Sequence, residues 1–420
     1  MTQPSISRRA VVRGLGGAAA VLAGGFPAFI PRRGEAADSI RIGEIEELTG
    51  PFSALAQNHV RGSALAVELW NRRGGVMGRK VEVVVEDNQN NPGVSVEKAR
   101  KLVQLDHVSA LFGTVNSAAT LSTGAAANNL GVAFVDSGGH TDDAVGKDCH
   151  WNTFMTCHNT WMMTHATGYS IAKLFGKRWY MITDDYAFGH AIVKGYGDIN
   201  GKVGGTVINN DLTPIGTSDY SAYITKIMAA KPDCVIVTLG GLGFVDFMKQ
   251  AQSFGLLDKI PTAGWAAELE NIWALPPAAR VGYWGAEWYF DGNSVLGDPG
   301  SPGHQFVEEY RKKYGEPPTA RSCFGYVAAD RLLWAINQSK STDAVKIART
   351  LEGAKFHSIW EGSSYYRRAD HSLMWPVWLA KLRANGTAAD PKDVFDIIDR
   401  QEPERLGSSP ASVCHMVYPS

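Results

Sequence analysis

Four loops in this sequence carry residue types that could bind a small molecule. Each follows a short apolar segment, and together they cover residues 49–55, 113–120, 136–141 and 184–189. In open α/β sheets, ligands bind where the carboxyl ends of parallel strands meet the amino ends of helices. Polar loops in one half of the chain and an aromatic loop in the other therefore indicate a shared binding site.

The polar loops offer main-chain groups to an anion. Asn116 or Ser117 can cap the helix that follows, which leaves backbone N–H groups free for a negatively charged partner. Gly138 and Gly139 carry no side chain, so a ligand can approach the backbone closely there. Each loop taken alone also fits a plain turn followed by a helix cap, and the combination is what favours a site.

Motifs for catalysis or nucleotide binding are incomplete or missing from the sequence. The glycine-rich turn at 240–246 has Asp246 where a dinucleotide fingerprint needs its last glycine, and a carboxylate there would repel a pyrophosphate. No P-loop and no G-x-S-x-G elbow occurs, and Ser170 with Lys173 lacks the companion motif of a Ser-x-x-Lys enzyme. We therefore expect a protein that is not an enzyme and that uses no cofactor.

Metal ligation also finds no support in the spacing of the residues. The eleven histidines show no His-Glu-x-x-His pattern. The acidic pairs at 142–143 and 184–185 are typical of solvated loops or helix starts, and no ordered series of oxygen ligands accompanies them. We expect no metal site.

Charge and composition exclude several classes of protein. The 420 residues carry 41 Lys and Arg against 42 Asp and Glu, a net charge of −1, and 45% of them are hydrophobic. These ordinary globular values exclude a disordered chain and a strongly basic nucleic-acid binder. At about 150 residues per domain, the length predicts two or three domains.

Residues 1–37 resemble an export signal. Arg8 and Arg9 precede a Gly- and Ala-rich apolar run at 15–30, which is short for a membrane span. A twin-arginine signal has this order of features, and an uncleaved N-terminal anchor is the alternative. Cleavage removes five arginines and one glutamate, leaving 36 positive and 41 negative side chains, a net of −5. We expect a periplasmic protein without membrane insertion.

Export implies an oxidising compartment, in which disulfides persist. Of the five cysteines, Cys149 and Cys157 are close enough in sequence to be tied across a local hairpin, although spacing alone does not prove that pair. Cys234 lies in an apolar run and is expected to pack as a small hydrophobic residue. The odd count leaves at least one cysteine unpaired.

Short apolar segments alternate with helix-like ones along most of the chain. In the first half, the strand-like segments are 40–43, 80–85, 108–112 and 132–135. After residue 158 the pattern restarts, with strand-like segments at 179–182, 206–208 and 234–237. This alternation predicts an α/β protein made of two doubly wound parallel-sheet lobes. Near the end, 358–366 and 374–382 are predicted to form a strand pair, and 402–420 to be irregular.

Five short motifs occur in a fixed order along the chain. They lie at 48–51, 71–79, 86–92, 185–189 and 217–221, and the first reads Leu48-Thr49-Gly50-Pro51. Together they resemble type I periplasmic solute-binding proteins of the branched-chain amino acid (Leu/Ile/Val-binding) ABC transporter family. The resemblance covers nearly the whole chain after the leader.

The resemblance implies two lobes joined by hinge crossovers, with the ligand clamped between them. Lobe one would take residues 39–157 and 286–356, and lobe two would take 158–285 and 357–420. In the family, the positions of Ser117 and of Gly139 with His140 hold a ligand's carboxylate and ammonium. The implied ligand-binding residues are Leu55, Asn116, Ser117, Gly138, Gly139, His140, Tyr186, Phe188, Leu242, Trp265 and Glu268.

The chain departs from the family at the acidic residue that grips the ligand's ammonium. That position falls near Ala266, whereas Glu268 lies two residues further on. A buried ammonium without an acceptor is costly, so the departure keeps an aromatic or aliphatic carboxylate open beside an amino acid.

The function that the resemblance implies is transport. We expect an exported substrate-binding protein of an ABC importer that captures a small carboxylate-bearing solute between two closing lobes and delivers it to a membrane permease. The alternative is a ligand-sensing receptor module of the same fold, for example for amides, without transport. We expect a monomer with no nucleic-acid partner.

Overall fold

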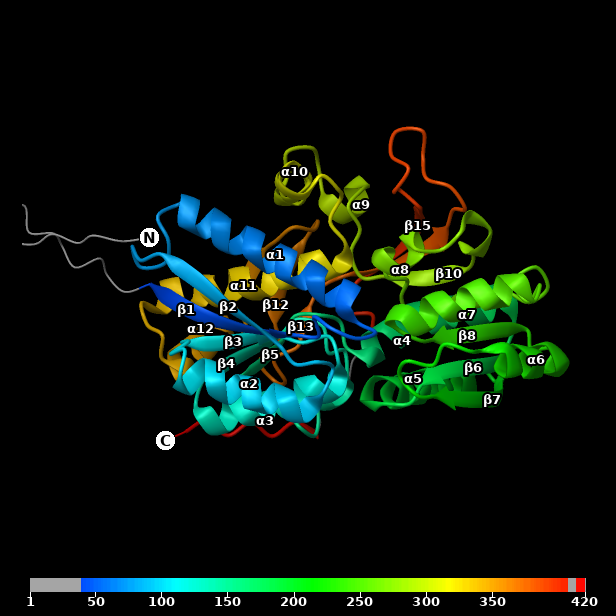
Figure 1. The fold of residues 1–420 in the computed structure, drawn as a ribbon, viewed down its shortest axis with the longest axis horizontal. Coiled ribbons are helices and arrows are strands. Elements are labelled where there is room, and N and C mark those ends of the chain that lie inside the picture. Colours follow the sequence, from blue (N-terminus) through cyan, green and yellow to red (C-terminus); the bar gives the residue numbers. More distant parts are fainter. Residues whose placement is uncertain (1–38, 407–412, 420) are drawn as a thin grey trace, which may run out of the picture. The chain divides into compact units, whose positions relative to one another are not determined.

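The computed structural model describes residues 39–406 and 413–419 of the chain. The predicted export signal at 1–37 lies outside these residues. Two large sheets flanked by helices organise the described part, together with one small sheet (Figure 1). This arrangement confirms the predicted α/β class.

The first large sheet has five parallel strands in the order β2-β1-β3-β4-β5. They are β1 (Ile40–Glu46), β2 (Val81–Asp87), β3 (Ala110–Gly113), β4 (Ala133–Asp136) and β5 (Thr153–Met155). The three inner strands are almost entirely buried, as expected for parallel strands covered on both faces. Helices α1 (Ser53–Arg72) and α11 (Ala320–Ser339) pack on one face, and α2 (Pro92–Gln104) and α3 (Ser117–Leu130) lie along the other (Figure 1).

The second large sheet has seven strands in the order β15-β14-β10-β9-β8-β6-β7. They are β6 (Arg178–Asp184), β7 (Thr206–Thr213), β8 (Cys234–Thr238), β9 (Thr262–Gly264), β10 (Tyr283–Ala286), β14 (Val377–Leu382) and β15 (Phe395–Gln401). The strands from β6 to β10 pair in parallel, whereas β14 and β15 add antiparallel to the edge formed by β10. Its helices are α4 (Thr160–Phe175), α5 (Ala187–Lys202), α6 (Ser221–Ala230), α7 (Gly241–Ser253) and α8 (Leu269–Trp273).

The remaining elements lie mostly between β10 and β14 in the sequence. They are two 3-10 turns (Asp142–Val145 and Pro277–Ala279), α9 (Asn293–Leu296), α10 (Pro302–Tyr314), α12 (Ala344–Leu351), β11 (Lys355–His357), β12 (Ser363–Tyr366) and β13 (Leu373–Met374). The predicted strand pair at 358–366 and 374–382 is only partly correct. Strand β12 does pair with β13, but β14 leaves for the second sheet because its side chains are apolar on both faces and need cover on both.

Three segments connect the two large sheets. The first runs from β5 to α4, the second leaves β10, and the third joins β13 to β14. The third connection at Trp375-Pro376 lies further along the chain than the predicted lobe boundary at 356–357. A bridge from Ser372 to Met155 joins the segment before β13 to β5 of the first large sheet, and a bridge from Tyr366 to Glu352 joins β12 to the end of α12.

The disulfide differs from the one that sequence spacing suggested. Cys149 bonds to Cys414, near the C-terminus, whereas Cys157 is a buried free thiol. Strand β5 lies between Cys149 and Cys157, so the extended backbone carries the two side chains apart. Cys234 packs in the core as predicted. Among the described residues, no helix combines the length and apolarity that crossing a bilayer requires.

The Cys149–Cys414 bond predicts a redox-dependent stability. The bond closes a loop of 265 residues, so reduction should lower the free energy of unfolding by about 2–4 kcal/mol. Thermal melts with and without dithiothreitol measure the effect. In a Cys149→Ser/Cys414→Ser control, the reductant should cause no further shift. A wild-type melting point unchanged by the reductant would contradict the prediction.

Candidate functional site

A small buried cavity lies where loops from the two large sheets meet. Its lining residues are Phe52, Leu55, Val115, His140, Tyr186, Phe188, Gly240, Trp265, Glu268 and Arg321. The free space between their atoms is about 260 Å³, and the part of it that a solvent molecule can reach holds about one water. Ligand pockets are usually larger, so the cavity in this form has no room for an organic solute.

Aromatic rings form a continuous wall around the cavity. Phe52 lies 6.1 Å from Tyr186, which lies 5.7 Å from Phe188. Phe188 meets Trp265 edge to face at 4.7 Å, and Trp265 meets the ring of His140 at 5.0 Å. Phe52 and His140 follow strands of the first sheet, whereas the other three follow strands of the second, so the wall needs residues from both sheets.

Two close contacts between α1 and α11 place Arg321 at the cavity. A side chain at Gly62 of α1 would collide with the backbone of Ser322, and one at Gly325 of α11 with the backbone of His59. These glycines let α1 and α11 approach closely, which carries Arg321 to the carboxyl end of the first sheet.

Arg321 forms a buried ion pair with Glu268 across the cavity. Its Nε lies 3.0 and 3.1 Å from the two carboxylate oxygens of Glu268, and Nη2 also donates to Oε1. Nη1 donates to the carbonyl of Gly138 at 3.2 Å. Both side chains are almost fully buried, so removing one partner would leave the other as an uncompensated charge.

In the loop that follows β4, backbone N–H groups donate hydrogen bonds to a side chain at the end of that strand. The Oδ1 atom of Asp136 accepts the N–H groups of Gly138 and Gly139 at 3.0 and 2.7 Å. Asn116 caps α3 by accepting from two backbone N–H groups, and Ser117 donates to the carbonyl of Gly139. These four predicted residues therefore support the wall of the cavity from behind rather than lining it.

Carboxyl groups outnumber cations around Arg321. Burial raises the pKa of Asp136 from 3.8 to about 7. Burial also raises the pKa of Glu46 and Glu287 well above the usual range, and Glu44 and Glu47 add to the shift of Glu46 by repulsion. Burial thus favours the neutral, protonated form of these acids, which leaves Glu268 as the carboxylate that pairs with Arg321.

His158 ties together the three segments that connect the sheets. It lies on the first segment, and its Nδ1 is 3.2 Å from Oε1 of Glu287 on the second. On the third, its Nε2 is 2.9 Å from the carbonyl of Pro376 and its ring stacks on Trp375 at 4.1 Å. The carbonyl of Pro376 can only accept, so the N–H of a neutral imidazole lies on Nε2, and Nδ1 accepts from Glu287, whose pKa is raised by burial.

Six of the eleven predicted residues line the cavity. They are Leu55, His140, Tyr186, Phe188, Trp265 and Glu268. Leu242 does not, because it lies on the first turn of α7 with 55% of its surface exposed. The eleven residues do not include Phe52, Val115, Gly240 and Arg321, although Phe52 and Val115 lie in the predicted loops 49–55 and 113–120. Phe52 follows the Leu48-Thr49-Gly50-Pro51 motif and could have been found, whereas Arg321 carries no local signal.

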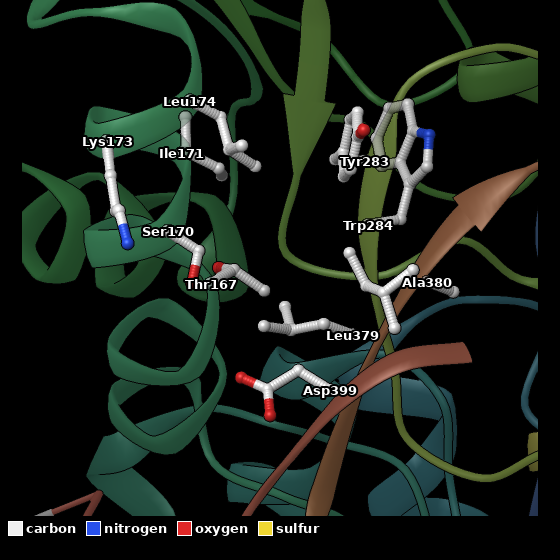
Figure 2. A pocket seen from close by; sticks show the side chains of 11 residues that line it. Thr167, Ser170, Ile171, Lys173, Leu174, Tyr283, Trp284, Leu379, Ala380 and Asp399 are labelled. Carbon is white, nitrogen blue, oxygen red and sulfur yellow. The ribbon is translucent and has the colours of Figure 1, made fainter. Parts of the chain in front are cut away.

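A separate apolar groove lies between α4 and the strands β10, β14 and β15 of the second sheet. Figure 2 shows Ile171 and Leu174 on one side, with Tyr283, Trp284 and Leu379 on the other. None of the predicted binding residues lines it. The cavity around Arg321, where polar groups converge, is therefore the candidate binding site.

Comparison with known proteins identifies a family that matches most of the chain. Residues 39–387 match the model of a family described as periplasmic binding protein. Leu/Ile/Val-binding protein homolog 7 from Brucella suis biovar 1 (strain 1330) is 28% identical over 350 residues, which span 79% of this chain and 84% of the relative.

Two solved structures share the fold. An amino acid ABC transporter substrate-binding protein from Pseudomonas fluorescens Pf-5 has a TM-score of 0.79 at 24% identity, covering 87% of this chain and 96% of that chain. A solute-binding protein of an ABC transporter from R. palustris, in complex with benzoate, has a TM-score of 0.77 at 21% identity, covering 87% and 97%. At such identities the likeness shows the fold.

The raised pKa of Asp136 predicts a pH-dependent stability. The folded protein favours the protonated acid, so this contribution is fully present below pH 3.8 and is lost as the pH rises through about 7. Asparagine keeps the accepting oxygen and cannot ionise. Relative to wild type, Asp136→Asn should therefore gain about 3 kcal/mol between about pH 5 and about pH 8.

Urea unfolding at the two pH values measures that gain. The matched control is Asp298→Asn, because Asp298 is an exposed loop residue. An equal response of both variants would contradict the assignment of the effect to Asp136.

Proposed function

Because this chain belongs to the periplasmic binding protein family, whose members are solute-binding proteins and not enzymes, we propose that it is the exported substrate-binding protein of an ABC importer. The observation that carries the proposal is the cavity itself. Loops from both large sheets line it, so neither side could enclose a solute alone. Hinge closure around a solute uses this arrangement.

The proposed solute is a small molecule with a carboxylate, either an amino acid or an aromatic or aliphatic acid. Arg321 is the cation among the lining residues, and a guanidinium matches a carboxylate with two parallel hydrogen bonds. The aromatic wall would pack on the apolar part of the solute. Likeness to a relative named for leucine, isoleucine and valine and to a benzoate complex supports both solute types.

Exchange of partners at the ion pair is the proposed binding step. Without solute, Glu268 satisfies Arg321 in the closed form. A solute carboxylate takes the place of Glu268 on Arg321, and Glu268 becomes free to accept an ammonium group if the solute carries one. Because the closed cavity holds about one water, the solute enters while the lobes are apart.

The connecting segments at His158, Glu287 and Pro376 are the proposed hinge between the two lobes. We place the predicted lobe boundaries at these segments, with the third at Trp375-Pro376. The partner is a membrane permease that accepts the closed form, and the chain works as a monomer after export by the twin-arginine route. These statements rest on the family and on the predicted signal at 1–37.

Removing both charges of the ion pair tests the role of Arg321. In Arg321→Met/Glu268→Met no buried charge is left unpaired, so the variant should fold. Amino acids, aromatic acids and aliphatic acids are screened by thermal shift, and a compound that binds should raise the melting point of wild type by mass action. The double variant should lose at least about tenfold in affinity for each hit.

Leu242→Ala is the matched control, because Leu242 belongs to the predicted set but lies outside the cavity. It should bind every hit as wild type does. The proposed site is wrong if the double variant keeps full affinity, or if Leu242→Ala loses as much.

Glu268→Gln separates the two solute types. The amide still accepts a hydrogen bond from Arg321 but offers no charge to an ammonium. Acids without an amine should therefore bind more tightly than they do to wild type, because the amide competes less well than a carboxylate for Arg321, whereas amino acids should lose at least about tenfold relative to those acids. Isothermal titration calorimetry measures both. Equal losses for the two types would refute the role assigned to Glu268.

A further inference from the structure

The ion pair of Arg321 and Glu268 lies in a part of the protein that is almost closed to water. The two side chains are 3% and 6% exposed, and the adjoining cavity has room for about one water. One positive and one negative charge therefore stand in a dry interior. Such an arrangement is tolerated only while each charge keeps an opposite partner.

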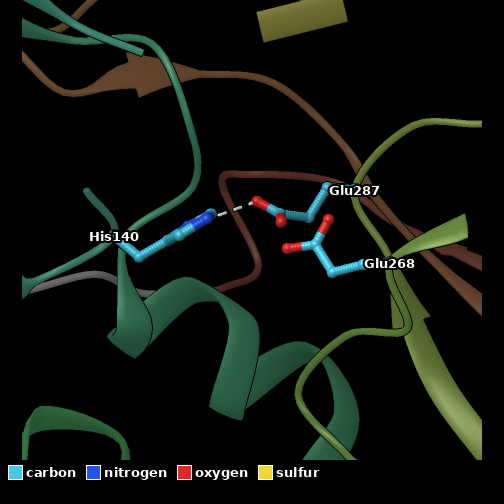
Figure 3. Close-up of side chains that lie close together, drawn as sticks. All are labelled: His140, Glu268 and Glu287. Atoms are coloured by element: carbon cyan, nitrogen blue, oxygen red, sulfur yellow. Dashed lines mark ion pairs between the residues drawn. The ribbon is translucent and has the colours of Figure 1, made fainter. Parts of the chain in front are cut away.

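Other buried acids surround Glu268. Figure 3 shows its carboxyl group close to that of Glu287, with the ring of His140 directed at Glu287, and polar atoms of these three residues lie within 4.8 Å of one another. Burial and repulsion from Glu268 raise the pKa of Glu270 to about 8. Burial also raises the pKa of Glu287 well above its usual range, although Arg321 opposes the shift. A second negative charge is therefore unfavourable here.

The histidines near the pair do not supply a second positive charge. Burial and the charge of Arg321 lower the pKa of His59 and of His140 well below the usual 6.5. Burial lowers the pKa of His158 to about 3. Among the described residues that line the cavity, Arg321 is the only lysine or arginine. A carboxylate that enters the cavity therefore has Arg321 alone to pair with.

The other titratable groups near the pair are acids. They come from the ends of β1 and β4, from the segment after β5 and from the segment after β6, and they are Glu46, Asp136, Cys157 and Tyr186. Burial raises the pKa of each of them. None carries a positive charge in either protonation state, so none can replace Arg321 as the partner of an anion.

The proposed exchange of partners changes the charge of this interior. Before binding, the charges of Arg321 and Glu268 sum to zero. A solute carboxylate that takes Arg321 adds one negative charge and leaves Glu268 without its partner. An amino acid compensates that charge with its own ammonium group, whereas an acid without an amine brings no compensation.

We propose that Glu268 binds a proton whenever the solute that displaces it from Arg321 carries no amine. The proton comes from solvent and bonds to a carboxylate oxygen of Glu268, so the site keeps a net charge of zero. An amino acid binds as a zwitterion and takes up no proton. This inference rests on the proposed function and deepens it, because it states how one site accepts both solute types.

Counting protons by isothermal titration calorimetry, in buffers of different ionisation enthalpy, tests the inference. The acids are benzoate and 4-methylpentanoate, or the tightest acid without an amine from the thermal-shift screen. The amino acid is leucine, which shares the 4-methylpentanoate skeleton, or the tightest amino acid from the screen. Each acid should take up about one proton at pH 7, and the amino acid close to none.

The pH dependence of affinity gives a second readout on the same protein. Between about pH 6 and about pH 8, the Kd of the acids should rise about tenfold per pH unit, because proton uptake accompanies binding. The Kd of the amino acid should stay within about twofold over that range.

Glu268→Gln removes the group that is assigned the proton. This variant should bind the same acids without proton uptake and with a Kd that no longer depends on pH. The matched control is Glu97→Gln, because Glu97 is exposed on α2, and it should keep the proton uptake of wild type. Proton counts on wild type keep the test decisive if Glu268→Gln fails to fold.

Acids that bind wild type without taking up a proton overturn the inference, and so does a proton uptake that Glu268→Gln retains. The proposed function stands in both cases, because the solute is still captured. If no acid without an amine binds even at about pH 5, where protons are abundant, the inference fails while capture of amino acids stands. If neither class of solute binds, the proposed function fails and this inference fails with it.

Discussion

The buried pair of Arg321 and Glu268 is the interaction on which the rest of the cleft depends. A guanidinium deep in the protein needs a carboxylate partner, and that partner comes from the opposite sheet. Glycine contacts between α1 and α11 bring Arg321 within reach, and the backbone of Gly138 takes one of its remaining N–H groups. A solute that binds here must therefore compete with an internal partner, which sets a threshold for affinity.

A second constraint is the way the connecting segments are fastened. His158 contacts all three, and its carbonyl oxygen accepts from His140 in the wall of the cavity. His158, at the centre of the connections, is therefore one hydrogen bond away from a residue that lines the cavity. His158 and His140 could therefore couple a movement of the connecting segments to a change in the cavity.

The sequence predicted the elements whose signals are local. Alternating apolar strands and helices predicted both sheets, and the aromatic loop at 184–189 predicted part of the wall. Arg321 was missed because it lies in α11, a helix that is predicted from its apolar stripe and in which a charged residue gives no signal of its own. Its partner, Glu268, is also remote in sequence. The same limit applies to Cys414, since a covalent bond across 265 residues leaves no mark on local spacing.

Some residues were predicted to bind the ligand from the composition of their loops alone, although tertiary packing decides which side chains face a cavity. Leu242 belongs to a glycine-rich turn of the right type, but the turn directs it to solvent. Likewise, Ser117 and Gly139 have the composition of an anion site, yet they bond to one another. Loop composition identifies the region of a site, whereas tertiary packing decides which atoms face it.

Residues 413–419 are anchored to the part of the molecule that contains the first sheet and α12. Cys414 is bonded to Cys149, Tyr418 donates to Glu352 at 2.6 Å, and the ring of Tyr418 lies under the guanidinium of Arg349. A dye attached at this tail would therefore report the position of the first sheet alone. Paired with a second dye on an exposed residue of α7, it would report any change in the distance between the first sheet and the second as an optical signal.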